Sequence, residues 1–233
     1  MAKGCIRGLV VRAVSNSQTF LATSSLKAQW LGRISYADGI ALQEEIVARK
    51  TADPQEPDQL LLLEHEPVYT IGRTPDQTSL REVSALPYPV HVINRGGQAT
   101  YHGPGQLVGY PILDLRRRGQ DLHLYLRAIE DLLLNLCGSL NIEAGRRDGL
   151  TGIWIGDQKL ASIGVGVRRW ISMHGFALNV TDESLAAFNH ITPCGIGGVQ
   201  MISLHRAGAE RLSVREVAAR TAEVFANSPA LAG

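Results

Sequence analysis

The chain has 233 residues, of which 45% are hydrophobic and 19% charged, and 23 basic against 22 acidic side chains give a net charge of +1. This composition is typical of a globular protein, and the charge gives no global signal for nucleic acid binding. No apolar run approaches the ~20 residues that a membrane-spanning helix needs. Three cysteines, an odd number, argue against a disulfide framework, so we predict a reducing compartment and a cytoplasmic protein.

The amino-terminal segment has an unusual charge balance. Its first 37 residues contain no Asp or Glu but carry five Lys and Arg. This composition resembles an organelle transit peptide, which would change the predicted compartment. We favour a loosely ordered tail over residues 1–26 that leads into a first strand near Leu31–Ser35. Residues 27–233 are then expected to form one domain, because no linker long enough to divide them is visible.

Helical and strand patterns alternate through the first half of the chain. Residues 37–50 place apolar side chains near one helical face, with Asp38 as the expected N-cap. After a polar loop, residues 59–72 predict a strand, a bend at Pro67 and a second short strand. The alternation in residues 89–95 predicts another strand.

The second half contains the clearest elements. Residues 121–141 have leucines at helical spacing, with Asp121 as N-cap, and predict the best-defined helix. Residues 152–180 predict a β-meander with a tight turn at "GDQ", and residues 214–225 predict a final helix. These patterns predict a single α+β domain with a mixed or antiparallel sheet flanked by helices.

The densest motif is "RGGQATYHGPGQLVGY", residues 95–110, which holds five glycines. Glycines let a ligand approach the backbone, and Arg95, Tyr101 and His102 could frame a pocket there. The alternative is a wide hairpin loop in which the glycines only turn the chain. The spacing does not fit a dinucleotide fingerprint, and the chain has no phosphate-binding P-loop. We favour a site for a small ligand.

The histidines and cysteines do not predict a metal site. The seven histidines include no H-x-x-x-H pair, and the cysteines at 5, 137 and 194 are never within C-x-x-C distance. We therefore predict neither a metal nor another cofactor.

Cys194 is the one cysteine whose surroundings suit chemistry. It lies in "ITPCGIGG", a loop of proline and glycines, whereas Cys137 falls in an apolar helix and Cys5 in the tail. A thiol attacks as the thiolate and needs a base or a cation beside it. Two partners are candidates, His190 four residues upstream and Lys159 in an otherwise apolar segment. Either could instead be an ordinary surface side chain.

Four blocks carry a resemblance to a known family. "LLLLEHEPVYTIGR", "RGGQATYHGPGQLVGYPI", "KLASIGVGVRRWISMHGFALNV" and "ITPCGI" resemble the signature blocks of the lipoyl(octanoyl) transferases, in family order from about Leu60 to Leu204. The resemblance implies a fold similar to the biotin/lipoate protein ligase catalytic domain. Two stretches depart from the pattern: "MISL" at 201–204 replaces the more usual "VTSL", and the first ~25 residues fit no block.

The resemblance also implies an enzyme, an acyltransferase of lipoate synthesis. Cys194 would take octanoate from acyl carrier protein as a thioester, and Lys159 would be its acid/base partner. The acyl group would pass to a lysine of a lipoyl domain, in 2-oxoacid dehydrogenases or the glycine cleavage H protein. The substrate-binding residues implied by the family blocks are Arg95, Gly96, Gly97, Gln98, Ala99, Thr100, Tyr101, His102, Ser162, Ile163, Gly164, Gly175, Phe176 and Ala177.

The physical chemistry agrees with this implication. A thioester carries an acyl group without ATP, so a phosphate loop is not needed. Backbone N–H groups around Gly96–Gly97 or Ser162–Gly164 could stabilise the oxyanion, a role commonly worth ~3–4 kcal/mol per donor. Acyl carrier proteins are acidic, so a basic patch is expected, with 116–118, Arg146–Arg147 and Arg168–Arg169 as candidates. Each run could equally be ordinary solvated charge.

Three rival functions remain open from the sequence. An ATP-dependent lipoate or biotin protein ligase would share the fold but needs no cysteine nucleophile. A non-catalytic binding module on the same scaffold would form no acyl intermediate. A cysteine hydrolase using Cys194 and His190 would release the free acid.

Overall fold

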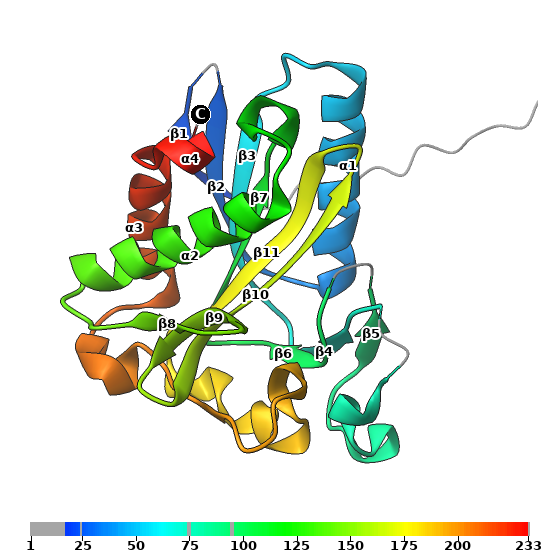
Figure 1. Ribbon diagram of the computed structural model, residues 1–233, viewed down its shortest axis with the longest axis vertical. Helices are drawn as coiled ribbons and strands as arrows, with labels where there is room; N and C mark the ends of the chain where they lie inside the picture. The colour runs from blue at the N-terminus through cyan, green and yellow to red at the C-terminus, as the bar shows by residue number, and fades with distance from the viewer. Residues whose placement is uncertain (1–16, 24, 74–75, 94–95, 233) are drawn as a thin grey trace, which may run out of the picture.

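The computed structural model of the chain describes residues 17–23, 25–73, 76–93 and 96–232. Its centre is a nine-stranded sheet in the order β1-β2-β3-β7-β11-β10-β9-β8, with β12 paired to β10 (Figure 1). The pairs β2–β3 and β10–β12 are parallel and the other neighbours antiparallel, which confirms the predicted mixed sheet. The strands of this sheet are β1 (Gln18–Ala22), β2 (Leu26–Ile34), β3 (Asp58–His65), β7 (Gln106–Ile112), β8 (Gly145–Arg147), β9 (Leu150–Ile155), β10 (Gln158–Arg168), β11 (Ile171–Asn179) and β12 (Gln200–Met201).

Helices cover both faces of the large sheet. The leucines of β3 alternate between two cores: Leu60 and Leu62 pack with α2 and α3, whereas Leu61 and Leu63 pack with α1. All of them are buried, because a strand between two helical layers has no solvent face. No helix among the described residues is long and apolar enough to cross a membrane. The helices are α1 (Tyr36–Ala52), α2 (Leu122–Ser139), α3 (Val214–Ala226) and the short α4 (Pro229–Ala232).

A small second sheet lies beside the lower end of the large one (Figure 1). Its order is β5-β4-β6, and it packs on the loops around residue 190 through a third core that includes Tyr69, Tyr101 and Phe188. The strands are β4 (Val68–Ile71), β5 (Val90–Val92) and β6 (Thr100–His102). The 3-10 turns of this region are η1 (Thr78–Leu80), η2 (Val83–Ala85), η4 (Asp182–Ser184), η5 (Ala186–His190) and η6 (Pro193–Gly195), and η3 (Leu115–Arg118) and the π-turn η7 (His205–Ala209) lie elsewhere.

The periodic segments were predicted well. Asp121 caps α2 by accepting from two backbone N–H groups, the β-meander forms β9, β10 and β11, and α3 starts at a capping box on Ser213. The expected cap Asp38 is wrong: Ser35 caps α1, and Asp38 donates its backbone N–H to that hydroxyl. The strand expected over 89–95 is shorter, and the two strands predicted within 59–72 belong to different sheets.

The amino-terminal prediction needs a correction. Within the expected tail of residues 1–26, β1 pairs with β2 at the edge of the large sheet, and Phe20 and Leu21 pack against the core. The strand expected near Leu31–Ser35 begins at Leu26. β1 was missed because a strand of five residues at the sheet edge has little alternation and gains its stability from its partner. Cys5 lies outside the described residues.

A buried charged network joins four elements at the upper end of the molecule. Asp58 of β3 contacts Lys50 Nζ at 2.6 Å and Arg118 Nη1 at 2.8 Å, and Lys50 is only 2% exposed. Arg118 also donates to the carbonyl of Leu231 in α4. Because each charge has a partner, the network ties α1, η3 and α4 to the sheet without leaving a buried ion unpaired.

His65, at the end of β3, is a buried neutral histidine. Its Nδ1 lies 3.1 Å from the carbonyl of Ile34 and its Nε2 lies 2.6 Å from the Tyr110 hydroxyl. Since a carbonyl only accepts, the proton sits on Nδ1 and Nε2 accepts from Tyr110. A Cβ at Gly39 would come within 2.8 Å of the ring, so the glycine in α1 makes room for it. Burial lowers the pKa of His65 to about 4.

This pKa predicts a pH-dependent stability. Between the ordinary value of about 6.5 and the folded value, the unfolded chain binds the proton more readily, so the free energy of unfolding falls as the pH decreases through that window. The loss should reach about 3 kcal/mol. Urea unfolding of the wild type and His65→Gln between pH 7.5 and 4.5 checks this: the gap between their curves should change with pH, and parallel curves would contradict it.

Candidate active site

The structure brings the two residues predicted to act together into contact. Lys159 comes from β10 and Cys194 from η6, and the Lys159 Nζ lies 3.3 Å from the Cys194 Sγ. Three residues further along β10, the Ser162 hydroxyl lies 3.6 Å from the same sulfur. Amine and hydroxyl therefore converge on one thiol, as a nucleophile that must lose its proton requires.

The backbone holds Cys194 in an uncommon conformation. Its φ of 55° lies in the left-handed region, and its N–H donates to the carbonyl of Ala99 at 2.9 Å. Gly195 follows with a φ of 71°, and a Cβ there would come within 2.7 Å of the Gln98 side chain. Glycine is therefore required next to the thiol, both for its conformation and for the close approach of the neighbouring loop.

A clasp formed by Ser79 and Arg81 joins the two loops around the sulfur. The Ser79 carbonyl accepts from the N–H of Thr192, while its hydroxyl accepts from the N–H of Ala99 and donates to the Gln98 amide. The Arg81 guanidinium donates to the carbonyl of Asn189 at 2.9 Å. Sequence reasoning missed this clasp, since nothing in the sequence pairs residues about 110 positions apart.

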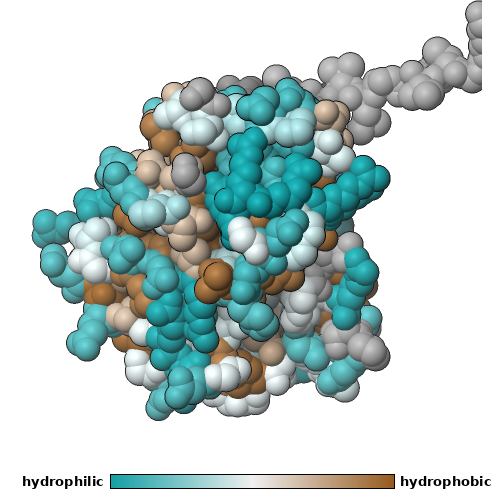
Figure 2. Space-filling model, turned by 45° about the horizontal axis from the view of Figure 1, so that its top comes forward, coloured by the Kyte–Doolittle hydropathy of each residue, from teal (hydrophilic) through white to brown (hydrophobic). Residues whose placement is uncertain are grey.

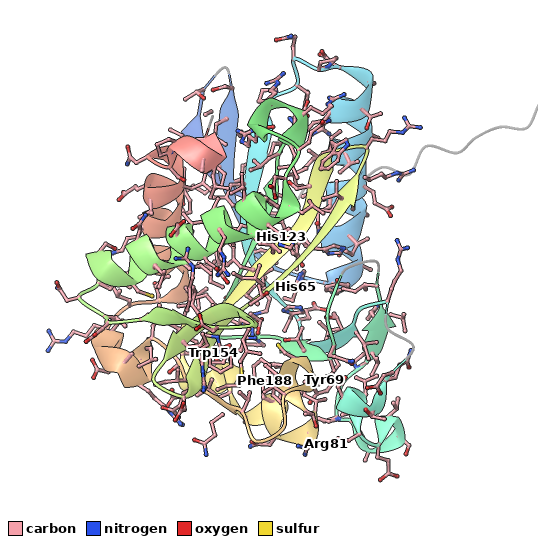
Figure 3. The ribbon with its side chains drawn as sticks, in the orientation of Figure 1. His65, Tyr69, Arg81, His123, Trp154 and Phe188 are labelled. Atoms are coloured by element: carbon pink, nitrogen blue, oxygen red, sulfur yellow. The ribbon has the colours of Figure 1, made fainter. Side chains whose placement is uncertain are left out.

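The backbone of Arg81 is strained at this position. Its φ of 56° and ψ of −122° fall in a region that side chains other than glycine rarely adopt. In Figure 3, Arg81 lies with Tyr69 and Phe188 at the end of the molecule that carries the third core. The packed core there can hold the strained residue in place.

Lys159 is buried without a carboxylate. It is 2% exposed, and among the described residues its side chain contacts the Cys194 sulfur and lies 5.1 Å from the centre of the Trp154 ring. In the described part of the chain it forms no ion pair with Asp or Glu. An ammonium in such a place is best matched by a thiolate, and a neutral amine by a thiol. The contact distance allows proton exchange between the two groups.

Gly152 leaves the space that the Lys159 side chain occupies. It lies in β9 with a φ of 126°, directly before Ile153 and Trp154, which face the bulge of β10 in the β9–β10 ladder. A Cβ there would lie 2.8 Å from the Lys159 Cε and 2.5 Å from the carbonyl of Ala161. The N–H of Gly152 donates to the buried carboxylate of Glu130 in α2, which fixes β9 against the helix.

The charge of Glu130 is compensated from two sides. Burial raises its pKa, but hydrogen bonds from Gly152, Arg146 and Arg127 outweigh this and hold the pKa below the usual range. The carboxylate therefore stays ionised and is engaged by these donors, so that it supports the strand beside Lys159.

A cavity of about 460 Å³ opens at the pair, a size suited to a small acyl chain. One wall is apolar, with Leu126 from α2, Ile163 and Val165 from β10, and Phe176 from β11. The rest of the cavity lining includes polar and aromatic side chains. Of the predicted residues, the lining includes Cys194, Lys159, Gly96, Gly97, Gln98, Thr100, His102, Ser162, Ile163, Gly164, Gly175, Phe176 and Ala177.

Two of the predicted substrate-binding residues do not line this cavity. Ala99 and Tyr101 are buried on the opposite side, in the third core, where Tyr101 packs on Phe188 and Tyr69. Side chains alternate along an extended segment, so Thr100 and His102 face the cavity while their neighbours face away. Ala99 and Tyr101 thus support the site from behind. Arg95 lies outside the described residues.

Other cavity residues were not among the predicted substrate-binding residues. They come from α1, α2, β7, β9 and the turn before it, β10, β11 and the segments that follow β5 and η6. They are Tyr36, Ile93, Val108, Tyr110, Leu122, Leu126, Gly149, Leu150, Thr151, Val165, His174 and Ile196. The only signal for Leu122 and Leu126 was their helical spacing, which indicates burial but does not distinguish a core from a cavity.

The other candidate groups lie elsewhere. His190 is exposed at the end of η5, and within the described residues no contact joins it to Cys194. Cys137 is buried in α2 as expected, and burial raises the pKa of its thiol to about 11. Neither is a partner for the Cys194 thiol.

Known proteins resemble this chain along most of its length. Residues 35–226 match the family model of the lipoyl protein ligase A/B catalytic domain. An octanoyltransferase of Geobacter sulfurreducens is 52% identical over 200 residues, covering 86% of this chain and 83% of the relative. An octanoyltransferase of Synechococcus elongatus is 48% identical over 176 residues, covering 74% and 75%.

Solved structures of low sequence identity share the fold. A bipartite lipoate protein ligase of Thermoplasma acidophilum superimposes with a TM-score of 0.62 at 16% identity, covering 84% of this chain and 83% of its own. A lipoate-protein ligase A bound with ATP gives 0.54 at 16% identity, covering 84% and 85%. These likenesses confirm the predicted ligase-like architecture. Since both the family model and relatives sharing about half of its residues cover most of the sequence, the chain belongs to the lipoyl protein ligase A/B catalytic domain family and, within it, to the octanoyltransferases, a group of acyltransferases.

Proposed function

We propose that this octanoyltransferase moves the octanoyl group through a thioester on Cys194, with Lys159 as the acid/base partner. The observation that carries the proposal is the 3.3 Å contact between the two side chains at a cavity of acyl-chain size. A ligase that activates its substrate as an acyl-adenylate has no use for a thiol at this point.

The first step is an exchange of thioesters. The Cys194 thiol gives its proton to Lys159, and the thiolate attacks the carbonyl of the donor thioester. As the tetrahedral intermediate collapses, the bond to the donor sulfur breaks and that sulfur takes the proton back from Lys159. The octanoyl group is then bound to Cys194, and no ATP is consumed because one thioester replaces another.

The second step passes the acyl group to an amine. The acceptor lysine attacks the Cys194 thioester and gives a proton to neutral Lys159, so that an amide forms and the bond to sulfur breaks. The protonated Lys159 then faces the released thiolate, which restores the starting pair. One lysine next to the sulfur can therefore serve both steps.

The developing oxyanion needs hydrogen-bond donors near the sulfur. The pairing of β10 with β9 ends at Ala161, and the next residues, Ser162–Gly164, line the cavity. Of the two expected donor regions, we favour this edge, because the N–H of Gly96 already points to the carbonyl of Val165 at 3.4 Å. Preorganised backbone donors are commonly worth ~3–4 kcal/mol each.

The proposed partners follow from this chemistry. The donor is the octanoyl form of acyl carrier protein, and the acceptors are lipoyl domains, including those of 2-oxoacid dehydrogenases and the glycine cleavage H protein. A nucleophilic thiol has to stay reduced, and Cys137 and Cys194 are both free. We therefore assign the protein to a reducing compartment such as the cytoplasm.

Incubation with octanoyl-carrier protein in the absence of ATP should give an octanoyl adduct on Cys194. Mass spectrometry of the intact protein and of its peptides should find one octanoyl group, removable by hydroxylamine, and Cys194→Ala should show none. Cys137→Ala serves as the control and should still be acylated. A folded wild type that forms no adduct without ATP but transfers octanoate with ATP would favour the ligase alternative.

Replacing Lys159 should slow both half-reactions. With Lys159→Ala the thiol loses its proton acceptor, and the rates of Cys194 acylation and of transfer to a lipoyl domain should fall about 10²–10⁴-fold. Rapid-quench kinetics measure the two steps separately. Gln158→Ala, a neighbouring change on the same strand, should leave both rates near those of the wild type, and near-normal acylation by Lys159→Ala would refute the role.

Filling the space at Gly152 should displace Lys159. In Gly152→Ala the new methyl group would meet the lysine side chain, and a shift of about 1 Å in a catalytic group can cost about 10²-fold in rate. Gly156→Ala is the matched control, because Gly156 also has a positive φ, of 55°, but faces open space. Equal losses of acylation rate in the two variants would contradict the packing argument.

A further inference from the structure

The structure separates the three basic runs by what their side chains do. In the first run, Arg116 pairs with Asp114 and Arg118 with the buried Asp58. In the second, Arg146 pairs with Glu130 and Asp131, and Arg147 with Asp157. These pairs tie the arginines to the fold, but the first run keeps a net positive charge, because Arg116 and Arg117 share Asp114 while Arg118 and Lys50 share Asp58.

The third run is different. Arg168 and Arg169 are exposed at the end of the β10–β11 hairpin, and among the described residues neither forms an ion pair or a side-chain hydrogen bond. Val167 and Trp170 beside them are 37% and 36% exposed. We call Val167–Trp170 the hairpin tip. Arginine and tryptophan are the residues that most often dominate the energy of protein interfaces.

The backbone of the hairpin tip is unfavourable for its own residues. Arg168 pairs with Ile171, so Arg169 and Trp170 form a two-residue turn, with φ values of 53° and 64°. Such turns favour Asn-Gly or Gly-Gly, because both residues need a positive φ. Among the described residues, the backbone of Val167–Trp170 receives one hydrogen bond from outside the hairpin, from the N–H of Leu115 to the carbonyl of Trp170. The conformation of this turn therefore does not explain why Arg169 and Trp170 occupy these two positions.

The hairpin tip is continuous with the walls of the cavity. The same two strands supply Ser162–Val165 and His174–Ala177 to the lining. At strand spacing, Arg168 lies about 10 Å beyond Val165 and about 20 Å from Ser162, which is next to the sulfur. In Figure 1 the hairpin turns beside the upper end of α1, and in Figure 2, where this end comes forward, a broad hydrophilic area occupies the upper part of the molecule.

We propose that the hairpin tip is the docking point of the acidic carrier protein that delivers the acyl thioester. This rests on the proposed function, which requires a protein donor. Two uncompensated arginines steer an acidic surface toward the site, and Trp170 and Val167 supply apolar contact once it arrives. A carrier docked there is displaced from the thiol by a distance that suits a substrate carried on a long flexible arm.

The test compares two donors that differ only in the protein part. For Arg168→Glu/Arg169→Glu, the KM for octanoyl-carrier protein should rise at least 10-fold at low salt, and the difference should shrink as salt is added. Acylation of Cys194 by octanoyl-pantetheine, a small thioester without a protein, should be unchanged. Arg211→Glu/Arg220→Glu, a charge-matched change on exposed residues around α3, should alter neither reaction.

A second variant excludes a folding defect as the cause. Arg169→Gly removes one charge and relieves the positive φ, so its Tm should be equal to or above that of the wild type while its KM for the carrier still rises. An unchanged carrier KM in the double variant would overturn the proposal, as would a rise only in the KM for the lipoyl domain. If wild-type Cys194 is not acylated even by octanoyl-pantetheine, the thioester mechanism itself fails, which is a separate result.

Discussion

The site depends on packing a lysine inside a β-sheet with a thiol as its polar partner. Lys159 can point inward because Gly152 has no side chain, a bulge in β10 shifts its register with β9, and the face of the Trp154 ring lies beside the amine. A carboxylate in the place of the thiol would form an ion pair with the ammonium and hold its proton there, so that the proton could not be transferred. Glu130 is near enough to fix the strand, but arginines and a backbone N–H engage it.

The thiol is positioned by loops that a stable scaffold can hold under strain. Cys194 and Arg81 both have a positive φ, and each belongs to a segment with few regular hydrogen bonds of its own. Ser79 connects these segments, and the core around Tyr69 and Phe188 supports them from below. Strain of this kind costs of order 1–3 kcal/mol per residue and persists where the surroundings over-determine it. The third core has this role here.

The spacing of apolar residues and the resemblance to the family's sequence blocks predicted different parts of the molecule. α2 and the meander follow from the spacing of apolar residues, and the family blocks brought Cys194 and Lys159 together although 35 positions separate them. A block match ignores side-chain alternation, so it assigned Tyr101 to the substrate along with Thr100 and His102. The edge strand β1 and the clasp at Arg81 depend on long-range pairing, which no local pattern contains.

β10 is a strand of 11 residues that contributes to the catalytic pair, the cavity and the hairpin tip. It holds Lys159 at one end, the cavity wall in the middle and Arg168 at the other end, and from Ala161 to Arg168 it keeps one register with β11. Deleting or inserting a single residue between them would turn every following side chain to the other face of the sheet. The length of this strand therefore fixes the distance between the thiol and the hairpin tip. Single substitutions within the strand leave that distance unchanged. An exchange of hairpins between relatives has to keep the same strand length.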